Sequence, residues 1–265
     1  MSFVFALAAS FFYGFAALRQ WFTITGKQSA NRAVVLIATC VGALLHLGHI
    51  GLTNFSQPQI NFELFAIGSL ISLTIVLLLL FSSWRKPIDS LFIGLLPMAA
   101  VVLLADALND HYAPLENISY GMVWHILLSI LAYSVLTIAA VQSVLLYLQD
   151  SALKKRQTTG FIQALPPLQL MDSLLFEMIW LGMILLTASY ALGWPYIFDL
   201  KEQHLGHKVV FAIISWLIFA WLLFGRYRFG WRGVIASRWT LIGTAFMILS
   251  YFGSKFVWEV LLKQV

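Results

Sequence analysis

Long apolar segments separated by short polar ones form the main pattern along this chain. A helix needs roughly 20 residues to cross a hydrocarbon core about 30 Å thick, and each apolar segment approaches or exceeds that length. The eight segments, bounded by charges, prolines or polar clusters, are residues 3–18, 33–54, 64–84, 90–108, 121–148, 172–193, 208–224 and 238–261. The pattern predicts an all-α fold, a polytopic transmembrane helix bundle of about eight spans that forms a single membrane domain over residues 1–265.

The composition is consistent with a lipid environment for most of the chain. Hydrophobic residues make up 61% of the sequence and charged residues only 10%. A soluble globule with these proportions would have too few polar residues to cover its surface. The lipid bilayer is therefore the first partner that the sequence predicts.

Basic residues determine the predicted orientation of the bundle. Twelve of the 16 lysines and arginines fall in four alternate connections, namely Arg19, Lys27 and Arg32; Arg85 and Lys86; Lys154, Lys155 and Arg156; and Arg226, Arg228, Arg232 and Arg238. Loops rich in Lys and Arg face the cytoplasm, so both chain termini are expected outside. The net charge of +5 lies in these short clusters and not along one polar face, and we expect no nucleic-acid partner.

Sequence motifs of common enzymes are absent. The chain has no glycine-rich phosphate-binding loop, no nucleophile elbow and no HExxH zinc motif. Cys40 is the single cysteine, so neither an intramolecular disulfide nor a two-cysteine redox motif can form. We therefore expect a protein that is not an enzyme.

The six histidines all lie toward the outer side of the predicted topology: His46, His49, His111, His125, His204 and His207. A six-coordinate haem needs two imidazole ligands on opposite faces of the porphyrin. His125 could pair with His46 or with His207, and these three are the candidate cofactor-binding residues. The alternative is that membrane histidines donate hydrogen bonds to neighbouring helices and loop histidines are solvated. Few carboxylates and no cysteine accompany them, so we predict no metal-ion site.

Several stretches resemble one known family. Residues 124–133, WHILLSILAY, resemble the histidine-containing helix of the cytochrome c assembly proteins, the CcsA, CcmC and HemX group of haem-handling membrane proteins. Residues 166–168, 208–220 and 229–233 look like later family segments, and residues 251–257 are similar to the ending of its bacterial inner-membrane branch, called YpjD. The resemblance covers residues 120–262 well, and the four variable helices of residues 1–119 only by general pattern. It implies location in the bacterial inner membrane.

Departures from the family pattern narrow the implied function. Haem-presenting members carry a tryptophan-rich WGxxWxWD stretch where residues 193–199 read GWPYIFD, and later histidines where Phe224 and Leu262 stand. Only His125 carries over as a family histidine. The resemblance thus implies haem binding, or an accessory or regulatory role in cytochrome c biogenesis with other maturation proteins as partners, and not full synthetase activity. The alternative is a scaffold that lost haem and is a partner or regulator of a membrane magnesium or cobalt transport system.

Overall fold

The computed structural model describes residues 1–26, 31–54, 61, 63–109, 119–156, 160–196 and 206–253. Its residues form two compact units, one of residues 1–116 and 158–166 and the other of residues 117–157 and 167–265. Eight helices in the described part are long and apolar enough to cross a membrane, which confirms the predicted all-α fold and number of spans.

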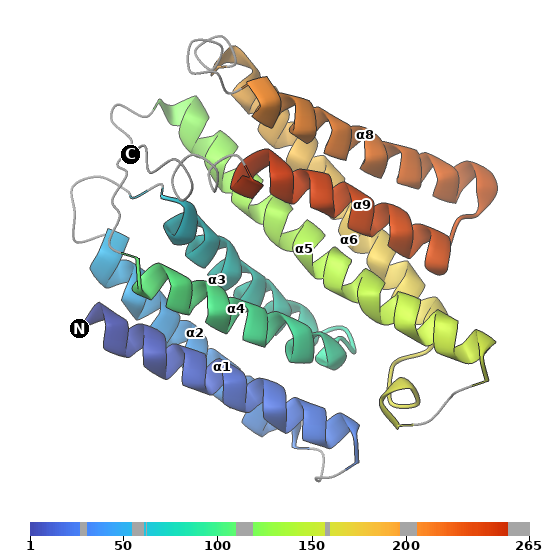
Figure 1. The fold of residues 1–265 in the computed structure, drawn as a ribbon, viewed down its shortest axis with the longest axis horizontal. Helices are drawn as coiled ribbons and strands as arrows, with labels where there is room; N and C mark the ends of the chain where they lie inside the picture. Colours follow the sequence, from blue (N-terminus) through green and yellow to red (C-terminus); the bar gives the residue numbers. More distant parts are fainter. Residues whose placement is uncertain are drawn as a thin grey trace. The chain divides into compact units, whose positions relative to one another are not determined.

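The N-terminal unit is built from four helices (Figure 1). They are α1 (Ser2–Ile24), α2 (Arg32–Asn54), α3 (Leu64–Ser83) and α4 (Phe92–Ala107), with the short turns η1 (Asp89–Leu91) before α4 and η2 (Gly160–Ile162). Helix α1 packs against α2 and α4, and α3 packs against the same two helices, so the four form a closed ring. Small residues permit this close packing: the backbone of Gly42 lies directly against the Tyr13 ring.

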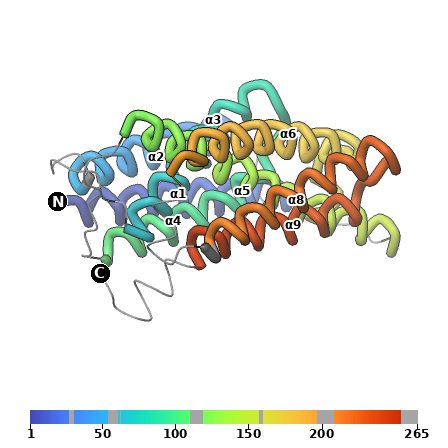
Figure 2. Tube along the Cα trace, turned by 90° about the horizontal axis from the view of Figure 1, so that it is seen from above, coloured from blue at the N-terminus to red at the C-terminus, as the bar shows by residue number. Residues whose placement is uncertain are grey.

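The C-terminal unit is a second four-helix ring. It consists of α5 (Tyr120–Lys154), α6 (Leu168–Gly193), η3 (Trp194–Tyr196), α8 (Gly206–Phe229), α9 (Val234–Ile248) and the π turn η4 (Leu249–Gly253). Figure 2 shows α8 and α9 side by side, and α5 packs against both α6 and α9. Helices α6 and α8 make the least extensive contact of the ring.

Five helices differ from the sequence prediction by four or more residues at one end. Helix α1 ends at Ile24 and not at residue 18, α6 begins at Leu168 and not at residue 172, and α8 ends at Phe229 and not at residue 224. Helix α5 runs from Tyr120 to Lys154, beyond the expected end at residue 148, because its polar last residues contain no helix breaker. Helix α9 begins at Val234, four residues earlier than expected, because Gly233 adopts φ +59° and starts the helix there. Charged residues mark where a helix leaves the hydrocarbon, and they do not mark where the helix ends.

Two carboxylates hold the start of α9. Asp172 of α6 accepts a hydrogen bond from the Gly233 amide at 3.0 Å, and Asp150 of α5 accepts one from the Val234 amide at 3.3 Å. Both carboxylates also form ion pairs, Asp172 with Arg226 at 2.8 Å and Asp150 with Lys154 at 2.9 Å. Negative charge at a helix N-terminus is favourable, so these contacts fix the position of α9 on α5 and α6.

We expect Asp172→Ala to lower the free energy of unfolding by about 2 kcal/mol, because hydrogen bonds to a charged group are lost and Arg226 loses its counter-charge. Lys154→Gln, which breaks only an exposed ion pair, should cost less than about 1 kcal/mol. Denaturant unfolding of the detergent-solubilised protein, followed by circular dichroism, measures both. Equal losses in the two variants would contradict the assigned role of Asp172.

Candidate functional site

His46 lies in the centre of the N-terminal unit and is fully buried. Its Nδ1 is 3.2 Å from the Tyr13 hydroxyl of α1, and its Nε2 is 3.0 Å from the Ser69 hydroxyl of α3. In either neutral tautomer one ring nitrogen donates and the other accepts, and the hydroxyls can take the complementary roles. Both nitrogens are therefore used in joining three helices, and neither offers a free lone pair to a metal or a haem iron.

His49 lies one helical turn further along α2 and is also bonded at both ring nitrogens. Its Nδ1 is 3.0 Å from the Ser2 carbonyl oxygen, which can only accept, so this nitrogen carries a proton. Its Nε2 is 3.2 Å from a carboxylate oxygen of Asp106 on α4. His46 and His49 thus connect α2 to α1, α3 and α4, as expected for polar residues that stabilise a bundle within lipid.

His125 differs in that, among the described residues, only one of its ring nitrogens has a hydrogen-bond partner. Its Nδ1 lies 2.8 Å from the Ser189 carbonyl oxygen of α6, so Nδ1 must donate its proton. The Ser189 hydroxyl lies 2.7 Å from that of Ser129 and donates to the His125 carbonyl oxygen at 3.2 Å, and it also lies near Nδ1. Because Nδ1 carries the proton, Nε2 keeps a lone pair, and no other described residue bonds to Nε2.

The position of His125 depends on the end of α6. A Cβ placed on Gly193 would lie 2.6 Å from Nδ1 of His125, so only glycine allows this approach. Just beyond, the Tyr196 hydroxyl accepts a hydrogen bond of 2.7 Å from Ser119, the residue that caps the N-terminus of α5. Residues 193–196, the part of the GWPYIFD stretch that the structure describes, therefore link the end of α6 to the start of α5, beside His125.

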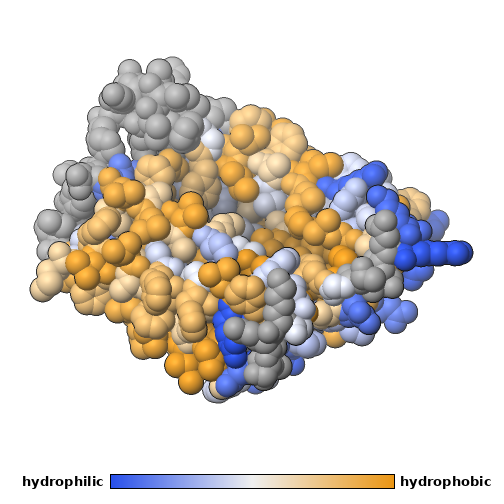
Figure 3. Space-filling view, turned by 60° about the horizontal axis from the view of Figure 1, so that its bottom comes forward, coloured by the Kyte–Doolittle hydropathy of each residue, from blue (hydrophilic) through white to orange (hydrophobic). Residues whose placement is uncertain are grey.

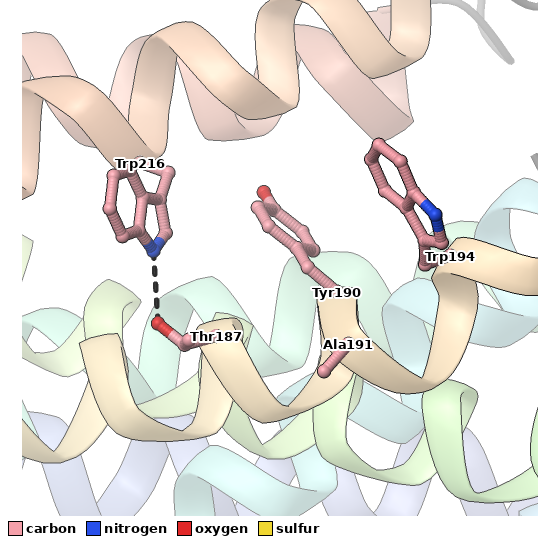
Figure 4. Close-up of a pocket in the computed structure, with 5 residues that line it drawn as sticks. All are labelled: Thr187, Tyr190, Ala191, Trp194 and Trp216. Carbon is pink, nitrogen blue, oxygen red and sulfur yellow. Dashed lines mark hydrogen bonds between the residues drawn. The ribbon is translucent and has the colours of Figure 1, made fainter.

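An apolar pocket of about 370 Å³ lies between α6 and α8. Thr187, Tyr190, Ala191 and Trp194 line it from the α6 side and Trp216 from α8, as Figure 4 shows. Trp216 donates its indole N–H to the Thr187 hydroxyl at 2.9 Å and closes one end of the pocket. Ser189 and Gly193 lie on the face of α6 that contacts α5, so this pocket and His125 occupy different sides of α6.

The other predicted residues are only partly described. The backbone of His207 lies in the first turn of α8, and its side chain lies outside the described residues, as do His111 and His204. No group of three or more His, Cys, Asp or Glu side chains that could hold a metal ion occurs among the described residues. His125 and His46 lie in separate units, and their pairing as two ligands of one haem stays a prediction.

Sequence reasoning singled out His125 and missed the residues that orient it. Ser129, Ser189 and Gly193 decide which nitrogen of His125 is free, yet small residues in an apolar helix are common and carry no motif. The available signal was spacing: Ser129 lies four residues after His125 and Gly193 four after Ser189, so each pair shares one face of its helix.

Comparisons with known proteins match most of the chain. The family model described as "Cytochrome C assembly protein" matches residues 33–262. The chain is 29% identical to the inner membrane protein YpjD of Escherichia coli K12, over 97% of this chain and 99% of that protein. It is 24% identical to protein HemX of Brevibacillus brevis, over 50% of this chain and 49% of that protein. No solved structure matches. The eight spans and the YpjD relative together indicate a multi-pass protein of the bacterial inner membrane.

We expect His46→Ala to lower the free energy of unfolding by about 2 kcal/mol, because two interhelical hydrogen bonds are lost and a cavity is left in the core. Thr53→Ala on the same helix is the matched control, because the Thr53 hydroxyl bonds only to backbone of its own helix. Thermal unfolding in detergent compares the two. If His46→Ala costs no more than Thr53→Ala, His46 does not hold the bundle together.

Proposed function

The chain belongs to the cytochrome c assembly protein family, and on that basis we propose that it binds haem through His125 as a non-enzymatic accessory of c-type cytochrome maturation. One observation carries the proposal: Nδ1 of His125 donates to the Ser189 carbonyl oxygen. Histidines that ligate a metal commonly donate their other ring N–H to a carbonyl or carboxylate, which fixes the tautomer and orients the ring.

The surroundings of His125 suit an axial ligand. The bound haem would supply the iron, whose ligand must be a neutral imidazole nitrogen. The Ser189 carbonyl keeps the proton on Nδ1, and the contact with Gly193 fixes where the ring lies. In the proposed site these residues would bind the iron and orient the imidazole ring.

The second axial position has one remaining candidate. His46 is bonded to Tyr13 and Ser69 at both ring nitrogens, so it could ligate iron only by breaking a buried hydrogen bond. That argues against His46 and leaves His207, in the first turn of α8, as the partner we propose for a six-coordinate haem. A haem held by His125 alone would be five-coordinate.

We propose an orientation with both termini outside the cytoplasm. In each unit, basic residues lie at or near the helix ends that the predicted topology places on the cytoplasmic side. In the N-terminal unit they are Arg32 at the start of α2 and Arg85 after α3. In the C-terminal unit they are Lys154, at the end of α5, and Arg226 and Arg228, at the end of α8. Such clusters mark the cytoplasmic side, so His125, near the start of α5, lies toward the outer side.

His125→Ala should abolish the Soret band of the purified protein after reconstitution with haem, because the donor nitrogen is removed. Gly193→Ala should weaken the band, since the added methyl group displaces the ring from the Ser189 carbonyl. Gly14→Ala is the matched control, because a Cβ at Gly14 meets no neighbouring atom. Absorption spectra at equal protein concentration measure all three.

A Soret band that is unchanged in His125→Ala would contradict the haem proposal. The second candidate function is that of a partner or regulator of a magnesium or cobalt transport system. It is motivated by the GWPYIFD stretch, and by Phe224 and Leu262, where haem-presenting family members carry tryptophans and histidines. A deletion strain separates the two. Normal c-type cytochromes with altered tolerance to these ions would support the second, and a cytochrome defect with normal tolerance would support the first.

The orientation is tested by cysteine labelling in intact cells. In a Cys40→Ala background, Lys155→Cys should react with a membrane-impermeant maleimide only after the cells are opened, because the loop after α5 faces the cytoplasm. Tyr120→Cys, at the other end of the same helix and 90% exposed, should react in intact cells. The reverse pattern would place both termini inside.

A further inference from the structure

Five aromatic rings form a continuous cluster where α8 meets α9. Trp221, Phe224, Phe229, Trp231 and Trp239 are its members, which we call the aromatic cluster. Ring centroids lie 5.8 Å apart for Trp221 and Trp231, 6.0 Å for Phe229 and Trp231, and 6.1 Å for the parallel rings of Trp231 and Trp239. Phe224 joins Trp221 at 5.6 Å and Phe229 at 6.0 Å. Phe224 is 49% and Phe229 59% exposed, so the cluster presents ring surface to its surroundings.

The backbone of the turn holds the cluster in place. Trp231 donates its amide to the Gly225 carbonyl oxygen at 3.3 Å and accepts a hydrogen bond of 3.0 Å from the Arg226 guanidinium. Gly230 adopts φ +66°, which other residues rarely adopt. The Arg226 guanidinium also lies over the Phe176 ring and pairs with Asp172. The turn is therefore a preformed structure, and its ring surface exists before any ligand binds.

Three arginines border the aromatic cluster and have no anionic partner in the described part of the chain. Arg228, Arg232 and Arg238 are exposed, and each is adjacent in sequence to a cluster member. Within the described residues, the one interaction of these arginines is that of the Arg228 guanidinium with the Phe229 ring, 6.0 Å from its centroid. The nearby carboxylates of Asp150 and Asp172 are already used by Lys154, Arg226 and the start of α9. These three positive charges are left uncompensated.

The turn lies at the membrane surface. One candidate span ends at Phe229 and the next begins at Val234, so residues 230–233 lie at the level of the lipid headgroups. Figure 3 shows hydrophilic residues gathered at the end where, in Figure 1, α5 ends and α8 meets α9, while the exposed helix flanks are mainly hydrophobic. This depth holds in either orientation of the chain.

From this juxtaposition we infer that the turn between α8 and α9 is a binding site for the headgroup of an anionic phospholipid. Arg228, Arg232 and Arg238 contact its phosphate oxygens, and the aromatic cluster packs against its glycerol and upper acyl carbons. Arginine binds phosphate through paired N–H groups, and tryptophan favours this interfacial depth. Phosphatidylcholine adds a positive choline group that the three arginines repel, so the site selects phosphatidylglycerol over phosphatidylcholine.

Native mass spectrometry of the detergent-purified full chain, mixed with equal amounts of phosphatidylglycerol and phosphatidylcholine, tests this site. The unmodified protein should retain phosphatidylglycerol preferentially. Each arginine changed to glutamine should weaken that preference about fivefold, the equivalent of about 1 kcal/mol per basic residue near the membrane surface. The triple variant Arg228→Gln, Arg232→Gln, Arg238→Gln should therefore lose it.

Two control variants separate a site from general charge. The triple change of the same arginines to lysine keeps the charges but removes the paired N–H groups, so it should weaken the preference, though less than the triple glutamine change does. Arg85→Gln removes an exposed positive charge after α3 and should change nothing. If the triple glutamine variant is aggregated in size-exclusion chromatography, the lipid preference is measured on the single variants Arg232→Gln and Arg238→Gln instead.

Three outcomes would overturn the inference. The first is an unchanged lipid preference in every glutamine variant. The second is an equal loss in Arg85→Gln, which would show a nonspecific charge effect. The third is displacement of bound phosphatidylglycerol by excess glycerol phosphate, which would identify a site for a soluble phosphate and not for a lipid.

Discussion

The absence of water from the hydrocarbon core is the constraint on which this structure depends. A polar group that is buried there must find its partner within the protein, because lipid tails offer none. In the N-terminal unit the fully buried His46 is bonded to hydroxyls of α1 and α3, and its neighbour His49 to backbone of α1 and a carboxylate of α4. In the C-terminal unit Ser215 of α8 donates to the Gly243 carbonyl oxygen of α9 at 2.9 Å. These contacts connect helices that apolar packing alone would hold less specifically.

The same constraint distinguishes two histidines that the sequence offers as candidate haem ligands, His46 and His125. Both lie within apolar helices and both can ligate iron. His46 meets a hydroxyl at each nitrogen, and its role in packing is complete. His125 meets a carbonyl at Nδ1, which fixes its tautomer and leaves a lone pair on Nε2. Hydrogen-bond partners, and not depth or residue type, decide which imidazole is available for chemistry.

Much of the fold follows from the sequence, because span length and hydropathy are local properties. All eight helices were predicted, but one end of α1, α5, α6, α8 and α9 was misplaced by four or more residues, because hydrogen bonding extends a helix past its apolar segment. His125 could be singled out through the family resemblance. Its partners could not, because Ser189 is 64 residues away and only the packing of α6 on α5 brings them together. The partners of His46 are hidden for the same reason.

The two carboxylates at the start of α9 bear on the order in which the chain can assemble. Asp150 and Asp172 belong to helices made before α9, and the amides of Gly233 and Val234 find these partners only once α5 and α6 lie together. Ribosomal synthesis runs from the N-terminus, so Asp150 and Asp172 are both made before α9. The N-terminus of α9 therefore gains both hydrogen bonds only after α5 and α6 have packed together, so an error in the packing of α5 on α6 would also misplace α9.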